Sequence, residues 1–126
     1  MVYIPSEVGW DMYDPRTTIK VEAAEDLGIG KGCYIASDGK AYLDDNSVSN
    51  MVHGVPLKSV KAGEQVVLVT HGRLYTTVLQ TIGNKAKVST ASGGAVISTT
   101  LSGVTAGFAI GAYLIMVHIE PASNNT

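Results

Sequence analysis

Apolar and polar residues alternate along short stretches of the chain. Within residues 17–23, Ile19, Val21 and Ala23 occupy every second position, with polar side chains between them. A period of two residues is typical of a β-strand that buries one face. No longer stretch keeps the three-to-four-residue spacing of an amphipathic helix. The pattern therefore predicts an almost entirely β chain.

Glycine and β-branched residues support this prediction. The chain has 14 glycines, 24 valines and isoleucines, and 11 threonines; the β-branched residues favour pleated, half-buried surfaces. Asp38-Gly39 between two apolar stretches predicts a hairpin, and His71-Gly72-Arg73 predicts a turn between two strands. We expect strands over residues 17–23, 33–36, 41–43, 52–57, 65–70, 74–78, 85–89, 95–98 and 113–119.

The length of 126 residues fits one domain with an arm. We expect an extended arm at residues 1–16, a β-barrel domain at residues 17–120 and a flexible polar tail at residues 121–126. The fold class is all-β: a small barrel of short strands, of the β-tulip or β-clip kind. Residues 29–39 and 82–93 resemble each other at an offset of 53 residues, and residues 66–71 also resemble residues 114–118. The two half-repeats form either one barrel or two lobes.

The arm holds three of the eight aromatic residues of the chain, Tyr3, Trp10 and Tyr13. Tyrosine and tryptophan often anchor protein interfaces. Our hypothesis is that these three residues contact a partner and that removal of residues 1–16 leaves the barrel folded. The alternative is that the arm packs on its own domain.

The charge balance argues against two classes of partner. The net charge is −2, so the chain lacks the basic excess that favours nucleic-acid binding. Residues 88–119 carry no Asp, Glu, Lys or Arg, but their strongly apolar part, residues 106–119, is too short to span a bilayer. Residues 1–15 lack the pattern of a signal peptide. We therefore expect no nucleic-acid partner and no membrane association.

The residues usual in catalysis and metal binding lack the required spacing. The sequence has no Gly-x-Ser-x-Gly motif, and the single cysteine, Cys33, lies in an apolar stretch where a buried, inert thiol is expected. His53 and His71 each precede a glycine and are expected at strand ends. His118 alternates with Leu114 and Met116, which predicts a face that is partly buried or at an interface. We expect no catalytic residue, no cofactor and no metal site.

Two further motifs have ordinary structural interpretations. Asp44-Asp45-Asn46 lacks the glycine and the distal glutamate of a calcium-binding loop, so a solvated loop is expected. Residues 28–32 (GIGKG) match neither phosphate-binding glycine motif, and no predicted helix follows them. A tight turn is expected there.

From about Ile19 onward the chain resembles the head-decoration, or capsid cement, proteins of tailed bacteriophages. The resemblance lies in the order of features along about 100 residues rather than in one chemical signature. These features are residues 21–27 (VEAAEDL), 30–35 (GKGCYI), 38–40 (DGK), 53–57 (HGVPL), 62–69 (AGEQVVLV), Gly72, 82–83 (IG), 91–94 (ASGG) and 107–112 (GFAIGA), followed by a last apolar strand.

This resemblance implies a non-enzymatic protein of the virion, made in the host cytoplasm and bound to the outside of an icosahedral head. Such proteins commonly form homotrimers on the shell and stabilise it by bridging major capsid protein subunits. The arm does not align with the family, so the role of Tyr3, Trp10 and Tyr13 rests on the physics of interfaces alone.

Several alternatives stay open. A small-ligand or glycan-binding β module of a virion or host-surface protein would need an exposed aromatic platform, and the barrel is poor in aromatic residues. Another virion or assembly protein, a β-clip accessory domain of an enzyme, and an oligonucleotide-binding barrel are further possibilities. The last would need basic residues among stacking aromatics, which this acidic chain lacks.

Overall fold

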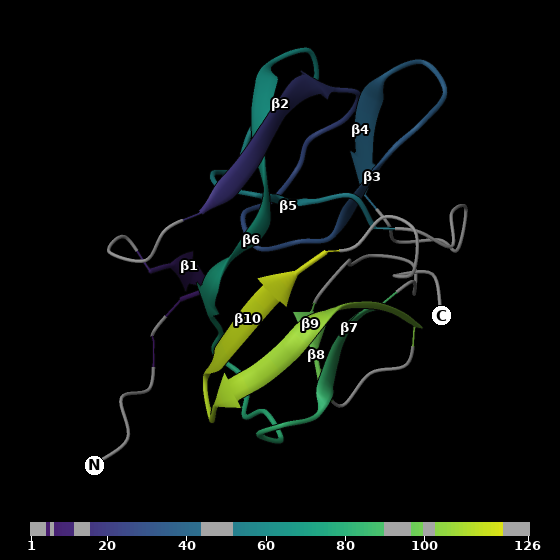
Figure 1. Ribbon diagram of the computed structural model, residues 1–126. Coiled ribbons are helices and arrows are strands. Elements are labelled where there is room, and N and C mark those ends of the chain that lie inside the picture. Colours follow the sequence, from purple (N-terminus) through teal and green to yellow (C-terminus); the bar gives the residue numbers. More distant parts are fainter. Residues whose placement is uncertain are drawn as a thin grey trace.

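The computed structural model describes residues 5, 7–11, 16–43, 52–89, 97–99 and 103–119. In these residues the chain is all-β, as the sequence predicts, and forms a curled sheet of short strands (Figure 1). The strands are β1 (Gly9–Trp10), β2 (Thr17–Ala23), β3 (Cys33–Ile35), β4 (Lys40–Leu43), β5 (Val55–Pro56), β6 (Gln65–Tyr75), β7 (Lys85–Ser89), β8 (Ile97–Ser98), β9 (Gly103–Gly111) and β10 (Leu114–His118).

The strands follow the order β3-β4-β2-β6-β10-β9-β7-β8, and β1 and β5 also pair with β6. Every pairing is antiparallel except that of β2 with β4. Strand β6 is the longest and joins the two ends of the molecule. It pairs with β2 and β5 through its first half and with β10 and β1 through its second (Figure 1).

The core consists of two apolar clusters, and Leu43 packs against both. The smaller cluster lies among β2, β3, β4 and the start of β6, and includes Leu27, Cys33 and Leu68. The larger cluster contains the inward residues of β7, β9 and β10, such as Ala86, Val88 and Ile115. The two clusters therefore correspond to the two ends of the curled sheet.

Local signals in the sequence predict several elements correctly. Strand β2 covers residues 17–23 and β7 covers residues 85–89, as expected. The Asp38-Gly39 pair joins β3 and β4 in an antiparallel hairpin, and Gly39 has a φ of 81°. Residues 28–32 contain a tight turn in which Lys31 N–H donates to the Gly28 carbonyl.

The predicted turn at His71-Gly72-Arg73 is wrong, because β6 continues through these residues without a break. A Cβ on Gly72 would lie 3.1 Å from Arg16 Cγ and 3.5 Å from the Trp10 ring. The glycine therefore serves close packing inside a strand rather than a change of direction. Consequently His71 lies within a strand and not at a strand end.

The N-terminal segment contributes to the sheet and to the core. Strand β1 pairs with β6 in the register Gly9–Tyr75 and Trp10–Leu74. The Trp10 ring is buried in the larger cluster, and its Nε1–H donates to the Pro56 carbonyl at 3.0 Å. Part of the segment expected as an arm thus packs on its own domain, and removal of residues 1–16 would take away a core side chain.

Candidate interaction surface

The outward side chains of β7, β9, β10 and the second half of β6 form one face of the sheet. The strand register aligns Lys85 of β7, Phe108 of β9, Met116 of β10 and Arg73 of β6 in a row across four strands. Tyr75–Leu114 and His71–His118 are the flanking pairs between β6 and β10. We call these eight residues the outer row face.

The outer row face is apolar at its centre. Phe108 is 42% exposed, and its neighbour Met116 is half-buried. The alternate residues of these strands, such as Ala86, Ala109 and Ile115, are fully buried in the core. Because an irregularity in the β7–β9 pairing falls beside Gly107, the side chain of Phe108 lies on the outward side. The face therefore presents an aromatic ring on a firmly packed sheet.

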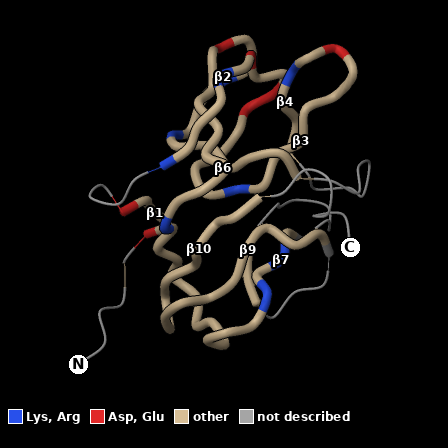
Figure 2. The backbone as a smooth tube through the Cα atoms, in the orientation of Figure 1, with Lys and Arg blue, Asp and Glu red and all other residues tan. Residues whose placement is uncertain are grey.

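The two charged residues of the row, Lys85 and Arg73, are both basic. Among the described residues, β7 carries the basic residues Lys85 and Lys87, and β9 and β10 carry no Asp, Glu, Lys or Arg. The acidic residues lie at the end of the molecule with β2, β3 and β4 and beside β1, where Asp11 N–H donates to the Arg73 carbonyl (Figure 2). Lys85 and Arg73 are the two end residues of the row Lys85–Phe108–Met116–Arg73, which we call the central row. An apolar centre between cations is complementary to an apolar surface with an acidic rim.

A second exposed apolar element, the segment of residues 76–84 between β6 and β7, lies at the same end of the molecule (Figure 1). Val78, Leu79 and Ile82 in this segment are 50%, 61% and 64% exposed. Large apolar side chains that gather on a surface commonly mark an interaction site.

Hydrogen bonds fix this segment despite its exposure. The side chain of Gln80 is buried; its amide donates to the Val78 carbonyl, and its oxygen accepts from Thr99 N–H. The Gln80 backbone N–H donates to the Ala112 carbonyl, and Gly83 N–H donates to Ala109. A preorganised loop loses little conformational entropy on binding.

The three aromatic residues predicted as anchors have different outcomes. Trp10 is a core residue of this chain and does not present its ring to a partner. Tyr3 and Tyr13 lie outside the described residues, so their role stays a hypothesis. The outer row face was missed by sequence analysis; the only signal was the alternation of His118 with Leu114 and Met116.

The histidines and the cysteine are placed by ordinary contacts. His53 Nδ1 accepts from Ile35 N–H at 2.9 Å, and burial lowers the pKa of His53. Cys33 is fully buried. His71 and His118 meet across β6 and β10, but in the described part of the chain no three His, Cys, Asp or Glu side chains gather as metal ligands would. Asp44-Asp45-Asn46 lies outside the described residues.

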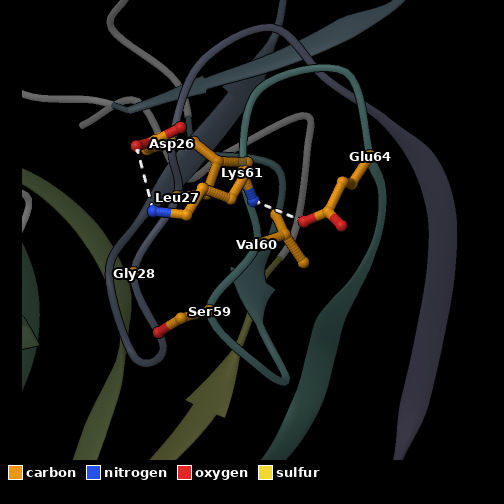
Figure 3. A pocket seen from close by; sticks show the side chains of 7 residues that line it. All are labelled: Asp26, Leu27, Gly28, Ser59, Val60, Lys61 and Glu64. Atoms are coloured by element: carbon orange, nitrogen blue, oxygen red, sulfur yellow. Dashed lines mark hydrogen bonds and ion pairs between the residues drawn. The ribbon is translucent and has the colours of Figure 1, made fainter.

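A shallow pocket of about 300 Å³ lies between the segment that follows β2 and the segment that precedes β6 (Figure 3). Its polar groups already bind the protein itself: Glu64 Oε1 accepts from Lys61 N–H, and Asp26 Oδ1 accepts from Ala62 N–H. Lys61 Nζ lies 4.0 Å from Asp26 Oδ2, with both side chains largely exposed. The carboxylates here hold the turn before β6. The lining residues are Asp26, Leu27, Gly28, Ser59, Val60, Lys61 and Glu64.

One aromatic pair was also missed by sequence analysis. Tyr34 and Tyr42 face each other across the β3–β4 hairpin with ring centroids 5.6 Å apart and planes 18° apart. Tyr42 Oη donates to Asp38 Oδ2 at 2.7 Å, and this hydrogen bond holds the pKa of Asp38 below its usual range. Stacked tyrosines beside a carboxylate form a small platform on the β3–β4 hairpin.

Fold and surface thus define a class: an all-β module of one curled sheet with exposed apolar residues on one face. Comparison with known proteins adds no family, because no family model matches the sequence and no curated protein is similar to it. Within the described residues, no helix is long and apolar enough to cross a membrane.

Proposed function

We propose that this protein is a non-enzymatic capsid decoration protein that binds the outer surface of an icosahedral phage head. In this proposal it bridges neighbouring subunits of the major capsid protein, as a homotrimer on the shell. The proposal takes the family from the order of sequence features and the docking surface from the outer row face. It places the protein in the virion after synthesis in the host cytoplasm.

The observation that carries the proposal is the central row Lys85–Phe108–Met116–Arg73. A cement protein needs a stiff body and a surface for protein contact. The inward residues of the same strands are buried, which stiffens the sheet behind the row. Many modest contacts of this kind, repeated around a shell, add up to strong attachment when copies are linked.

The partner surface follows from the chemistry of the face. An aromatic ring and a methionine between two cations fit an apolar patch of the capsid protein that is flanked by acidic residues. Tyr3 and Tyr13 would add contacts from the arm. Because the complementary charges lie at the rim, we expect binding to weaken as salt increases.

The test uses decoration-free phage heads and the full-length protein. Co-sedimentation with expanded and with unexpanded heads should give saturable binding to the expanded form alone. Absence of binding to both forms, with a protein that is folded by circular dichroism, would reject the decoration function.

A second candidate, a glycan-binding module, is favoured by the Tyr34–Tyr42 pair with Asp38 beside it. Aromatic faces pack against sugar rings, and a carboxylate accepts hydrogen bonds from hydroxyl groups. A glycan array with wild type and Tyr34→Ala tests it. Binding that disappears in Tyr34→Ala supports this function, and an array without any bound glycan rejects it.

A further inference from the structure

We propose that His71 and His118 bind a divalent transition-metal ion of the Zn²⁺ and Ni²⁺ class. The two residues are 47 positions apart in the sequence, yet the β6–β10 register sets them directly opposite each other. Their ring centroids are 4.6 Å apart at an interplanar angle of 85°. Imidazole nitrogens are preferred ligands for these ions, and this proposal does not depend on the decoration function.

A series of hydrogen bonds connects Thr17, Thr70 and the His71 ring. The Thr70 hydroxyl donates its single proton to the Thr17 carbonyl at 3.2 Å. Thr70 Oγ1 lies 3.0 Å from His71 Nδ1, and with its own proton committed it can only accept there. This geometry favours the tautomer in which Nδ1 donates to Thr70 and Nε2 has the lone pair that a metal ion needs.

This arrangement is the one found at metal sites. A ligating histidine usually donates its second ring nitrogen to a fixed oxygen, which orients the ring and raises the basicity of the other nitrogen. All three residues of this hydrogen-bonded series lie in strands: Thr17 belongs to β2, and Thr70 and His71 belong to β6. The orienting oxygen is thus present before any metal binds.

His118 completes the site from the end of β10. Its side chain is exposed, while His71 is half-buried. The rings meet edge to face with centroids 4.6 Å apart, so an ion held by His71 lies within reach of the His118 imidazole. Solvent reaches the pair from the His118 side, which provides the entry path that a metal site needs.

The donor set also defines the kind of binding. Two neutral imidazoles supply two coordination positions, and zinc prefers four ligands, so water or a group from another molecule fills the rest. The next outward residue on β6 is Arg73, a cation. We therefore expect weaker binding than at a zinc site with four protein ligands, and a preference for Zn²⁺, Ni²⁺ and Cu²⁺ over Mg²⁺ and Ca²⁺, which prefer oxygen.

The test is isothermal titration of the full chain, free of any affinity tag, with Zn²⁺ and with Mg²⁺ at about pH 7.5, where imidazoles are largely neutral. We expect one Zn²⁺ per chain and no binding of Mg²⁺. His118→Ala, at an exposed position, should weaken Zn²⁺ binding about tenfold or more, as should His71→Ala, because loss of even an outer partner has effects of that size.

Two variants separate this site from others. Thr70→Val removes the orienting oxygen and should weaken binding about tenfold while His118→Ala and His71→Ala remain the larger losses. His53→Asn alters the histidine outside the pair and should bind Zn²⁺ as wild type does. No binding at millimolar Zn²⁺, or equal affinity in wild type and His118→Ala, would overturn the proposal.

Discussion

His53 connects two segments through a hydrogen bond that only its neutral ring can accept. Ile35 N–H donates to Nδ1, and burial lowers the pKa of His53 below its ordinary value of about 6.5. Above about pH 6.5 the ring is neutral in both the folded and the unfolded chain. Its hydrogen bond then contributes fully to the free energy of unfolding. As the pH falls through the lowered pKa, the unfolded chain takes up the proton first, so the free energy of unfolding decreases.

We expect His53→Asn to reduce this pH dependence. The asparagine oxygen can accept from Ile35 N–H and does not titrate. Urea denaturation of both proteins at neutral pH and at about pH 5 measures the effect, since these two pH values lie on either side of the ordinary histidine pKa. Equal loss of stability in the two proteins at the lower pH would contradict the assignment.

Tyr42 controls the ionisation of Asp38. Its hydroxyl donates to Asp38 Oδ2 and is the largest cause of the lowered pKa of that carboxyl group. In Tyr42→Phe we expect the pKa of Asp38 to rise toward its ordinary value. The measurement is an NMR titration of the Asp38 carboxyl carbon in both proteins. An unchanged pKa would show that Tyr42 is not the controlling group.

At the scale of single strands, β1 shows that part of the N-terminal segment belongs to the folded domain. Trp10 contributes a buried ring and a hydrogen bond to Pro56. Trp10→Ala should lower the free energy of unfolding by about 3–5 kcal/mol, because it leaves a large cavity. Chemical denaturation measures the change, and a loss below about 1 kcal/mol, typical of surface positions, would contradict the core role.

The burial of Trp10 in the core also changes how the role of residues 1–16 is tested. Deletion of residues 1–16 would combine loss of core packing with loss of any contact to a partner. The variants Tyr3→Ala and Tyr13→Ala leave Trp10 in place. Weaker binding by these variants, at unchanged stability, is the outcome that the anchor hypothesis predicts.

Strand β9 depends on a close approach of two backbones at Gly107. A Cβ at this position would overlap the Met116 carbonyl group of β10. Gly107→Ala should therefore cost about 1–3 kcal/mol in the free energy of unfolding, as overpacking does. Gly9→Ala is the control, because no atom lies within 4 Å of the added methyl group. Similar stability of the two variants would disprove the tight contact.

The sequence predicts those elements whose signals are local. Asp38-Gly39 specifies its hairpin within four residues, and residues 17–23 alternate throughout. A turn was predicted at Gly72, but this residue lies inside β6, and β9 (Gly103–Gly111) is not among the expected strands. The local pattern cannot distinguish a glycine that turns the chain from one that makes room for Trp10.

The candidate surface was less predictable than the fold. Lys85, Phe108, Met116 and Arg73 come from four strands, and two of the pairings contain irregular registers. One shift of register moves a side chain to the other face of a sheet. Only the assembled sheet could therefore identify the row, or bring His71 to His118.

At the scale of the whole molecule, the charges and the apolar groups are divided between two ends. The acidic residues gather mainly over β2–β4, and the outer row face with residues 76–84 lies at the other end (Figure 2). Such a division suits a protein that docks by one end and exposes the other to solvent. Attachment to the shell should then leave Tyr34 and Tyr42 accessible.

The most direct measurement compares two serine variants in co-sedimentation with expanded, decoration-free heads. Phe108→Ser removes the aromatic centre of the outer row face, and Ile19→Ser removes a similarly exposed apolar side chain, 38% exposed, from β2. We expect Phe108→Ser to weaken binding about tenfold or more, as loss of an interface anchor does, while Ile19→Ser binds as wild type does. Equal binding by all three proteins would contradict docking through this face.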